Sequence, residues 1–253
     1  MKTRHRRACI DIETFPILGH TWGPKWEANL LDVVQRIRLA SFAWKWFGEP
    51  TTHCLALPDM PGYEKNKESD RELVQELWKV FDEADILVAH NGKAFDFKQS
   101  NAFFVQNDIK PPSPYVVIDT KTEAKRYFKF PSNSLDDLGQ YLGVGRKERT
   151  GGMDLWWDCM DGKPDAWRRM KRYNKQDVVL LEKVYEKIMP WMNTHPNLNV
   201  YEDRIKCCKI CLGSRLQSRG SQIRRNGRVI RYVCQDCGAW NQGAYTKSDT
   251  LIR

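Results

Sequence analysis

Two carboxylates on one face of an apolar strand are the feature that most constrains the fold of this chain. Residues 7–13 alternate as a strand does and include Asp11 and Glu13, with Pro16 following shortly after. Side chains alternate between the two faces of a strand, so these two point the same way, roughly 6–7 Å apart. In a buried strand they repel each other and lose hydration, which a bound cation would offset. The alternative is a solvated face of an edge strand, where the pair needs no cation.

Two further acidic positions follow on predicted helices. Residues 85–90 form a short apolar run typical of a buried central strand, and Asp96 comes in the first turn of the helix predicted over 94–107. The positive end of the helix dipole stabilises a carboxylate at that position. In the helix predicted over 165–191, Tyr173 and Asp177 are four residues apart and share a face. Taken singly, these features also fit a helix-start aspartate and a surface Tyr–Asp pair.

The order of the predicted elements indicates an α/β fold with a mixed sheet covered by helices. Residues 14–31 are predicted to form a loop. The other predicted elements are strands at 7–13, 39–47, 51–57, 85–90 and 115–118, with helices at 70–82, 94–107 and 165–191 and others starting at 121 and 134. No apolar run of about 18 residues is present, so we expect no transmembrane helix and no membrane partner. Without a signal peptide, the expected location is the cytoplasm, or the host cytoplasm if the chain is phage-encoded.

Four cysteines near the end of the sequence have the spacing of a metal site. Cys208 and Cys211 form one Cys-x-x-Cys pair, and Cys234 and Cys237 form a second. This pattern predicts a small C-terminal Cys₄ zinc ribbon with one structural Zn²⁺, in which Gly238 permits a tight turn. Disulfides are the alternative, which the lack of a secretory signal disfavours. A further cysteine, Cys207, is a competing candidate for the position of Cys208.

The excess positive charge of the chain lies in the same region. The net charge is +9, and residues 204–253 hold 11 Lys/Arg and 2 Asp/Glu, so this segment accounts for all of it. Asn226 and Gly227 predict a hairpin turn flanked by Arg224, Arg225 and Arg228, which suits a phosphate backbone. The alternative is a zinc module that docks another protein. We predict a first domain over residues 1–195, a linker over 196–203 and a basic zinc-ribbon module over 204–253.

Considered together, the acidic segments resemble the three motifs of the DEDDy (DnaQ-like) family of 3′–5′ exonucleases. The matching residues are Asp11-Ile12-Glu13, Asn91-Gly92-Lys93-Ala94-Phe95-Asp96 and Tyr173-Asn174-Lys175-Gln176-Asp177. The proofreading exonuclease domain of family-B DNA polymerases is the most similar member, because residues 11–14 read Asp-Ile-Glu-Thr. The resemblance covers about residues 7–190 and implies an RNase H-like fold with a mixed five-stranded sheet flanked by helices. The chain looks like a free-standing, phage-type nuclease with an added zinc ribbon.

The resemblance also implies roles for individual residues. Two Mg²⁺ or Mn²⁺ ions are expected, with Asp11 bridging both and Asp96 supporting the second. Glu13 and Asp177 would hold the ion that activates the attacking water, and Tyr173 would orient that water. Further substrate contacts are expected from Thr14, Phe15, Asn91 and Lys147. For Phe15 a place in the core, and for Lys147 an ordinary solvated side chain, are the alternatives.

The predicted function is therefore a two-metal-ion 3′–5′ exonuclease that acts on DNA, preferably single-stranded, and releases nucleoside 5′-monophosphates. The alternatives are an RNA 3′-end trimming exonuclease of the same superfamily and a non-catalytic zinc-ribbon protein that binds nucleic acid. Nucleic acid is the expected partner, with a replication protein docked on the zinc ribbon as a second one.

Overall fold

The computed structural model describes residues 5–23, 29–148, 150–202 and 206–247. The chain forms two compact units, one of residues 6–184 and one of residues 185–253 together with residues 1–5. Each unit has its own sheet. The division of the chain into residues 1–195, 196–203 and 204–253 remains a prediction, and the junction at residues 203–204 lies outside the described residues.

The larger unit contains a five-stranded mixed sheet with the strand order β5-β4-β1-β6-β7. Its strands are β1 (Arg7–Phe15), β4 (Arg38–Trp46), β5 (His53–Ala56), β6 (Ile86–Ala89) and β7 (Val116–Asp119). The central strand β1 pairs antiparallel with β4 and parallel with β6, and β6 pairs parallel with β7. The predicted α/β class and mixed five-stranded sheet are confirmed.

The segment predicted as a loop over residues 14–31 is partly wrong. Strand β1 continues to Phe15, and a short strand β2 (Leu18–His20) then pairs with β3 (Asp32–Gln35) as a separate two-stranded sheet. Residues 24–28 of the predicted loop lie outside the described residues. The pairing joins segments that are not adjacent in sequence, which local patterns do not reveal.

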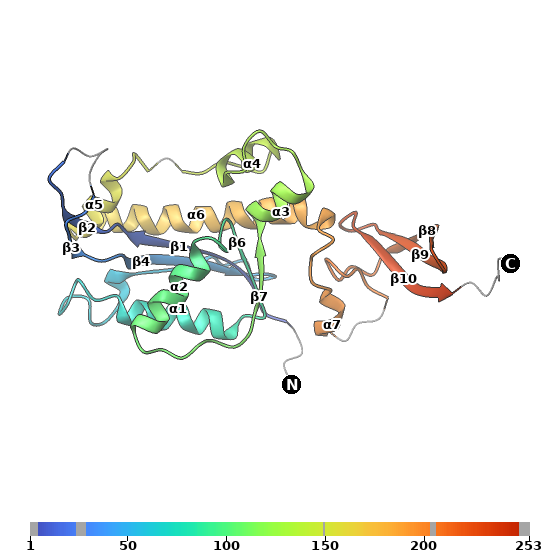
Figure 1. Cartoon of the computed structure of the whole chain (residues 1–253), viewed down its shortest axis with the longest axis horizontal. Helices are drawn as coiled ribbons and strands as arrows, with labels where there is room; N and C mark the ends of the chain where they lie inside the picture. Colours follow the sequence, from blue (N-terminus) through green and yellow to red (C-terminus); the bar gives the residue numbers. More distant parts are fainter. Residues whose placement is uncertain (1–4, 24–28, 149, 203–205, 248–253) are drawn as a thin grey trace. The chain divides into compact units, whose positions relative to one another are not determined.

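Helices cover both faces of the five-stranded sheet (Figure 1). They are α1 (Arg71–Glu83), α2 (Asp96–Gln106), α3 (Thr120–Tyr127), α4 (Leu135–Tyr141), α5 (Asp154–Met160) and the long α6 (Pro164–Ile188), whose last four residues belong to the smaller unit, with a 3₁₀ turn η1 (Leu57–Asp59). The Ser134 hydroxyl accepts a hydrogen bond from the backbone N–H of Asp137 at 3.1 Å, so Ser134 caps α4. Helix α5 was not predicted. Within the described part of the chain, no helix is long and apolar enough to span a membrane.

The two faces of β1 have different surroundings. Ala8, Ile10 and Ile12 belong to the hydrophobic core that α1 covers with Leu73 and Leu77. Asp11 and Glu13 alternate with these residues and so point to the other face. Helix α6 runs along that face, and its long axis follows the strands in Figure 1. The alternation of apolar and acidic residues in β1 thus determines which face of the sheet carries Asp11 and Glu13.

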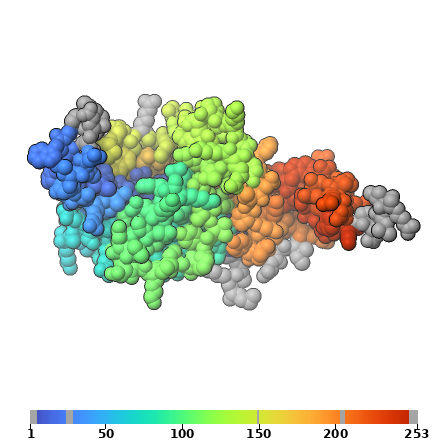
Figure 2. Space-filling view, viewed as in Figure 1, coloured from blue at the N-terminus to red at the C-terminus, as the bar shows by residue number. Residues whose placement is uncertain are grey.

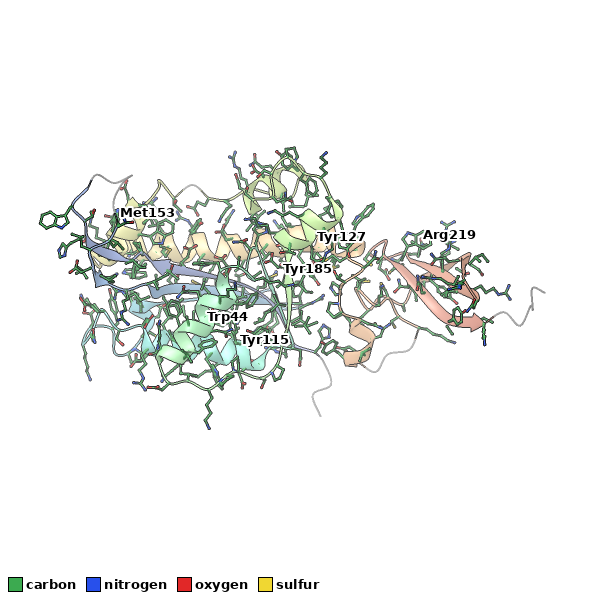
Figure 3. The ribbon with its side chains drawn as sticks, viewed as in Figure 1. Trp44, Tyr115, Tyr127, Met153, Tyr185 and Arg219 are labelled. Carbon is green, nitrogen blue, oxygen red and sulfur yellow. The ribbon has the colours of Figure 1, made fainter. Side chains whose placement is uncertain are left out.

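Aromatic rings fill the space between the sheet and the helices on the α1 side. Phe81 of α1 meets Phe104 of α2 edge-on at 5.4 Å, and it meets Tyr115 in the same way at the same distance. Tyr115, which directly precedes β7, is labelled in Figure 3. In the space-filling view, α1, α2 and the segment that follows them cover much of the sheet on the viewed side (Figure 2). This packed layer holds β1 and β6 in place.

The smaller unit contains an antiparallel three-stranded sheet in the order β10-β9-β8. Its elements are η2 (Met189–Trp191), α7 (Leu198–Glu202), β8 (Leu216–Arg224), β9 (Gly227–Cys234) and β10 (Trp240–Lys247). The predicted hairpin turn lies between β8 and β9. Helix α7 falls within the predicted linker, where Leu198 is buried and donates its backbone N–H to the carbonyl of Lys209 at 2.8 Å.

Each Cys-x-x-Cys pair is followed by a residue in the left-handed region. Gly238 after Cys237 has φ 80°, and Leu212 after Cys211 has φ 63°. Glycine adopts this conformation freely, whereas leucine pays a steric cost of about 1–2 kcal/mol. The same turn is therefore relaxed at one pair and strained at the other.

We call the sheet of β8, β9 and β10 the ribbon sheet. We expect Leu212→Gly to stabilise it and Gly238→Ala to destabilise it, each by about 1 kcal/mol. Hydrogen exchange of the β9 and β10 amides in the full chain measures the local change. If both substitutions accelerate exchange equally, backbone strain at Leu212 does not determine the stability of this sheet.

Candidate functional site

Three carboxylates gather between the central strand and the long helix. Carboxylate oxygens of Asp11 and Glu13 on β1 and of Asp177 on α6 all lie within 4.8 Å of one another. Asp177 is fully buried, while Asp11 and Glu13 are partly exposed. The structure thus brings together residues from the first and third predicted motifs.

A buried amide positions one of these carboxylates. Asn174 of α6 donates a hydrogen bond from Nδ2 to Oδ2 of Asp11 at 2.6 Å, and its Oδ1 accepts one from the hydroxyl of Ser41 on β4 at 3.2 Å. Asn174 and Ser41 are both fully buried. Asn174 precedes Asp177 by three residues, so helical spacing could have placed it on the same face, but sequence reasoning did not single it out.

Asp96 lies close to the cluster but is oriented differently. It is the first residue of α2 and is buried, and its Oδ1 accepts the backbone N–H of Ile12 at 3.2 Å. Its oxygens are not part of the group within 4.8 Å. The second motif therefore meets the first through the backbone of β1, between Asp11 and Glu13.

The cluster is electrostatically unfavourable without a cation. Burial, followed by the charge of Glu13, raises the pKa of Asp11 well above its ordinary value. Burial and the charge of Asp177 raise the pKa of Glu13 from 4.5 to about 8. Burial also raises the pKa of Asp96 to about 6. It raises the pKa of Asp177 as well, although the charge of Lys147 acts to lower that pKa. Ionising these groups in the folded protein costs free energy, which bound cations would offset.

One cation already faces the cluster. The ammonium of Lys147 lies 2.7 Å from Oδ2 of Asp177 and 5.1 Å from the centre of the Tyr173 ring. Burial alone would lower the pKa of Lys147, but the charges and hydrogen bonds of Asp177 and Tyr173 together outweigh burial, so this pKa is raised. The backbone N–H of Lys147 donates to Oδ1 of Asp136 at 2.7 Å, which fixes its loop. Lys147, predicted as a substrate contact, is thus located at the carboxylates.

The carboxylate cluster fits a hard divalent cation. Oδ1 of Asp177 is buried and has no hydrogen-bond partner among the described residues. A buried carboxylate oxygen without a partner is costly unless a cation binds it. Mg²⁺ and Mn²⁺ prefer oxygen ligands, which is the donor set found here.

Tyr173 lies one helical turn before Asp177. Its ring is half-buried and meets Trp156 of α5 edge-on at 6.2 Å. Burial, together with the charge of Glu13, raises the pKa of its hydroxyl. The phenol therefore stays protonated at neutral pH and can donate a hydrogen bond.

The other predicted substrate contacts differ in their surroundings. Thr14 is half-buried next to Glu13. Phe15 is 1 % exposed and packs edge-on against Trp167 of α6 at 5.8 Å, which favours the alternative of a place in the core over a substrate contact. Asn91 has φ 67° and donates its backbone N–H to Asp119 at 3.1 Å, which gives it a place in a turn.

Asp119 is a structural residue that sequence reasoning missed. This buried carboxylate ends β7 and accepts backbone N–H groups of Asn91, Lys93, Lys121 and Thr122. It therefore ties the turn before α2 to the start of α3. Its position between a strand and a helix is a typical N-cap signal.

The four predicted zinc ligands also come together. Sγ of Cys208 lies 3.7 Å from that of Cys237, and Sγ of Cys211 lies 3.6 Å from that of Cys234. All four sulfurs are within 4.8 Å of one another, and Cys207 is not part of the group. Disulfide sulfurs would be about 2.05 Å apart, so these cysteines are thiols. Four convergent sulfurs fit a tetrahedral metal ion.

The three arginines predicted to contact nucleic acid are exposed around the tip of the β8–β9 hairpin. Arg224 ends β8, Arg225 lies in the turn and Arg228 follows on β9. Figure 3 shows side chains of this sheet, with Arg219 of β8 labelled.

Comparisons with known proteins agree with the observed sheet. The family model of the RNase H superfamily matches residues 59–189. Among solved structures, the chain is similar to the family B DNA polymerase from the hyperthermophilic archaeon Pyrobaculum calidifontis, with a TM-score of 0.51 and 14 % sequence identity. That match covers 74 % of this chain but 25 % of the polymerase, so it is a likeness of fold over a quarter of the longer protein. No curated protein matches the sequence. Because the family match spans more than half of the sequence, the chain belongs to the RNase H superfamily.

Proposed function

We propose that this protein is a metal-dependent 3′–5′ exonuclease that removes nucleoside 5′-monophosphates from the 3′ end of single-stranded DNA. The observation that carries the proposal is the convergence of Asp11, Glu13 and Asp177, with a buried oxygen of Asp177 left without a partner. Membership of the RNase H superfamily supports nuclease activity in general. The 3′–5′ direction rests on the resemblance of the three motifs to DEDDy exonucleases. The choice of DNA rests on the Asp-Ile-Glu-Thr sequence of the first motif.

Asp11, Glu13 and Asp177 would hold a first Mg²⁺ or Mn²⁺, and Asp96 would contribute to a second next to Asp11. Two such ions about 3.5–4 Å apart activate a water for attack and stabilise charge on the leaving oxygen of a phosphodiester. Asp96 would use Oδ2 for this role, because its Oδ1 accepts the N–H of Ile12.

The remaining residues of the site would position these groups. Asn174 keeps the Asp11 carboxylate in one orientation through its hydrogen bond. The protonated hydroxyl of Tyr173 would orient the attacking water rather than remove its proton, because its pKa is raised. The ammonium of Lys147 brings positive charge to the carboxylates and would offset the negative charge of a phosphate bound there.

The four cysteines of the smaller unit would hold one Zn²⁺. Asn241 donates from Nδ2 to Sγ of Cys208 at 3.4 Å, and the backbone N–H of Gly213 donates to Sγ of Cys211 at 3.4 Å. Such hydrogen bonds stabilise thiolate ligands. With four thiolates and no open position, this zinc would be structural. Phage origin and a replication partner at the ribbon remain predictions.

Asp177→Asn should slow degradation by at least about 100-fold, because it removes a buried ligand charge from the cluster. The assay uses single-stranded DNA and RNA labelled at the 5′ end, with Mg²⁺ or Mn²⁺ and a parallel 3′-labelled strand. Wild type should give a ladder from the 5′ label and immediate mononucleotide from the 3′ label.

Asp165→Asn is the matched control, since Asp165 lies exposed in the first turn of the same helix and undergoes the same chemical change. Degradation by Asp177→Asn at the rate of Asp165→Asn would contradict the assigned site, and faster cleavage of RNA would contradict the DNA preference.

Glu13→Gln should stabilise the protein when no Mg²⁺ or Mn²⁺ is added. The pKa of Glu13 is raised from 4.5 to about 8, so the folded state loses stability as pH rises through this range. The gain of Glu13→Gln over wild type should be absent below pH 4.5 and largest above pH 8. A melting temperature at least about 2 °C higher is expected at the upper end. Added Mg²⁺ should raise the melting temperature of wild type more than that of the variant, and equal shifts would contradict metal binding by Glu13.

Cys234→Ser should remove the zinc, because three thiolates and a hydroxyl bind it weakly. Zinc content of the purified full chain, measured by mass spectrometry, should fall well below one ion per chain. Cys207→Ser is the matched control and should retain the metal, since Cys207 is not part of the sulfur cluster. Loss of zinc in both variants, or in neither, would argue against the Cys₄ site.

A further inference from the structure

The two faces of the ribbon sheet carry different side chains. In β9, residues 229, 231 and 233 point to one face because strand side chains alternate. Their partners in the neighbouring strands include Gln222 on β8 and Gln242 and Trp240 on β10, which therefore share this face. The opposite face bears Arg228 and Ile230, with Ile230 41 % exposed. The first face, which we call the polar face, thus carries polar and aromatic side chains beside Val229 and Val233, while Ile230 is exposed on the other.

The polar face is hollowed. A depression of about 550 Å³ lies there, within the size range of small-molecule sites. We call it the ribbon groove and define it by Lys209, Gln222, Arg224, Arg231, Trp240 and Gln242. The amide of Gln242 donates to Oε1 of Gln222 at 3.2 Å across the sheet.

The charge of the ribbon groove is entirely positive. Lys209, Arg224 and Arg231 contribute three cations, and none of its described lining residues is acidic. Asp236 is the sole acidic residue between 206 and 247, and it accepts a hydrogen bond from Nε of Arg215 at 2.6 Å. A hollow with cations and no carboxylate attracts anions and is complementary to a phosphate backbone.

Trp240 gives the ribbon groove a second recognition element. Its side chain is 53 % exposed, which is unusual for so large an apolar ring. The guanidinium of Arg231 lies 5.6 Å from the ring centre, within the range of a cation–π contact. An exposed indole beside cations is the combination with which proteins bind unpaired bases and their phosphates.

We propose that the ribbon groove binds single-stranded nucleic acid, with a base stacked on Trp240 and neighbouring phosphates paired with Arg224, Arg231 and Lys209. The bases of a duplex are already stacked on one another, so only an unpaired base can use Trp240. Arg228, also predicted to contact nucleic acid, lies on the opposite face and is not part of this arrangement. Single-stranded nucleic acid is also the substrate class of the proposed exonuclease, and this inference rests on that proposed function. Binding in the ribbon groove does not itself need the carboxylates.

The test measures binding by the zinc-loaded full chain carrying Asp177→Asn, so that the strand survives. Fluorescence anisotropy is recorded with labelled DNA and RNA single strands of about 12 nucleotides, and with a duplex of the same length. Trp240→Ala should weaken single-strand binding roughly 5- to 150-fold and leave the salt dependence unchanged. Arg231→Ala should weaken it and also reduce the slope of log K against log salt by about 0.7.

Arg71→Ala is the control: it removes the same charge from the exposed start of α1, outside the ribbon groove and the carboxylate cluster, and it should leave affinity and slope near those of the parent. Trp240→Phe should restore most of the affinity lost in Trp240→Ala. Zinc content and the melting temperature confirm that each variant is folded.

The proposal is overturned if Trp240→Ala binds as tightly as the parent, or if duplex binds as tightly as single strands with the same dependence on Trp240. The relative affinities of the two single strands identify the sugar that the ribbon groove accepts. Nuclease activity of the chain with Asp177 intact is measured on the same strands. Binding that depends on Trp240, without cleavage, would contradict the proposed exonuclease activity and support the ribbon groove. Cleavage with binding that does not depend on Trp240 would support the exonuclease activity and contradict the ribbon groove.

Discussion

The repulsion among carboxylates crowded between the central strand and α6 is the constraint on which the rest of the larger unit depends. Asp11, Glu13 and Asp177 are held within 4.8 Å although burial and mutual repulsion raise their pKa values. Such a cluster persists only where the surrounding structure is stable enough to outweigh the repulsion between its carboxylates. Here β1 has a neighbouring strand on each side, α1 packs on its apolar face and α6 on the other. The packed core thus stabilises an arrangement that the carboxylates alone would oppose.

Much of this could be predicted because the decisive patterns are local. Alternation in β1 places Asp11 and Glu13 on one face, and the spacing of Tyr173 and Asp177 places them on one side of α6. Contacts between distant segments were out of reach of such patterns. The hydrogen bond from Asn174 to Asp11 joins residues 163 positions apart, and the burial of Phe15 depends on Trp167 at the start of α6. Neither follows from propensity or periodicity.

The smaller unit shows the same division between what is local and what is not. Cysteine spacing alone predicted the four convergent sulfurs, because each Cys-x-x-Cys pair is a single turn of chain. The character of the two sheet faces depends on strand register, which the sequence between the pairs does not specify. Helix α7 escaped prediction for a related reason, since its Leu198 is ordered by the carbonyl of Lys209 rather than by its own neighbours.

The chain of hydrogen bonds from Ser41 through Asn174 to Asp11 has a mechanical consequence. The fully buried Ser41 of β4 and Asn174 of α6 connect to Asp11 on β1, and the same helix carries Asp177. The separation of helix and sheet therefore sets the spacing of the carboxylates. A change in side-chain volume under α6, at Val178 or Leu181 for example, would alter that spacing without contacting the site. Selection on catalytic geometry would then restrict the interior of this domain more narrowly than folding alone requires.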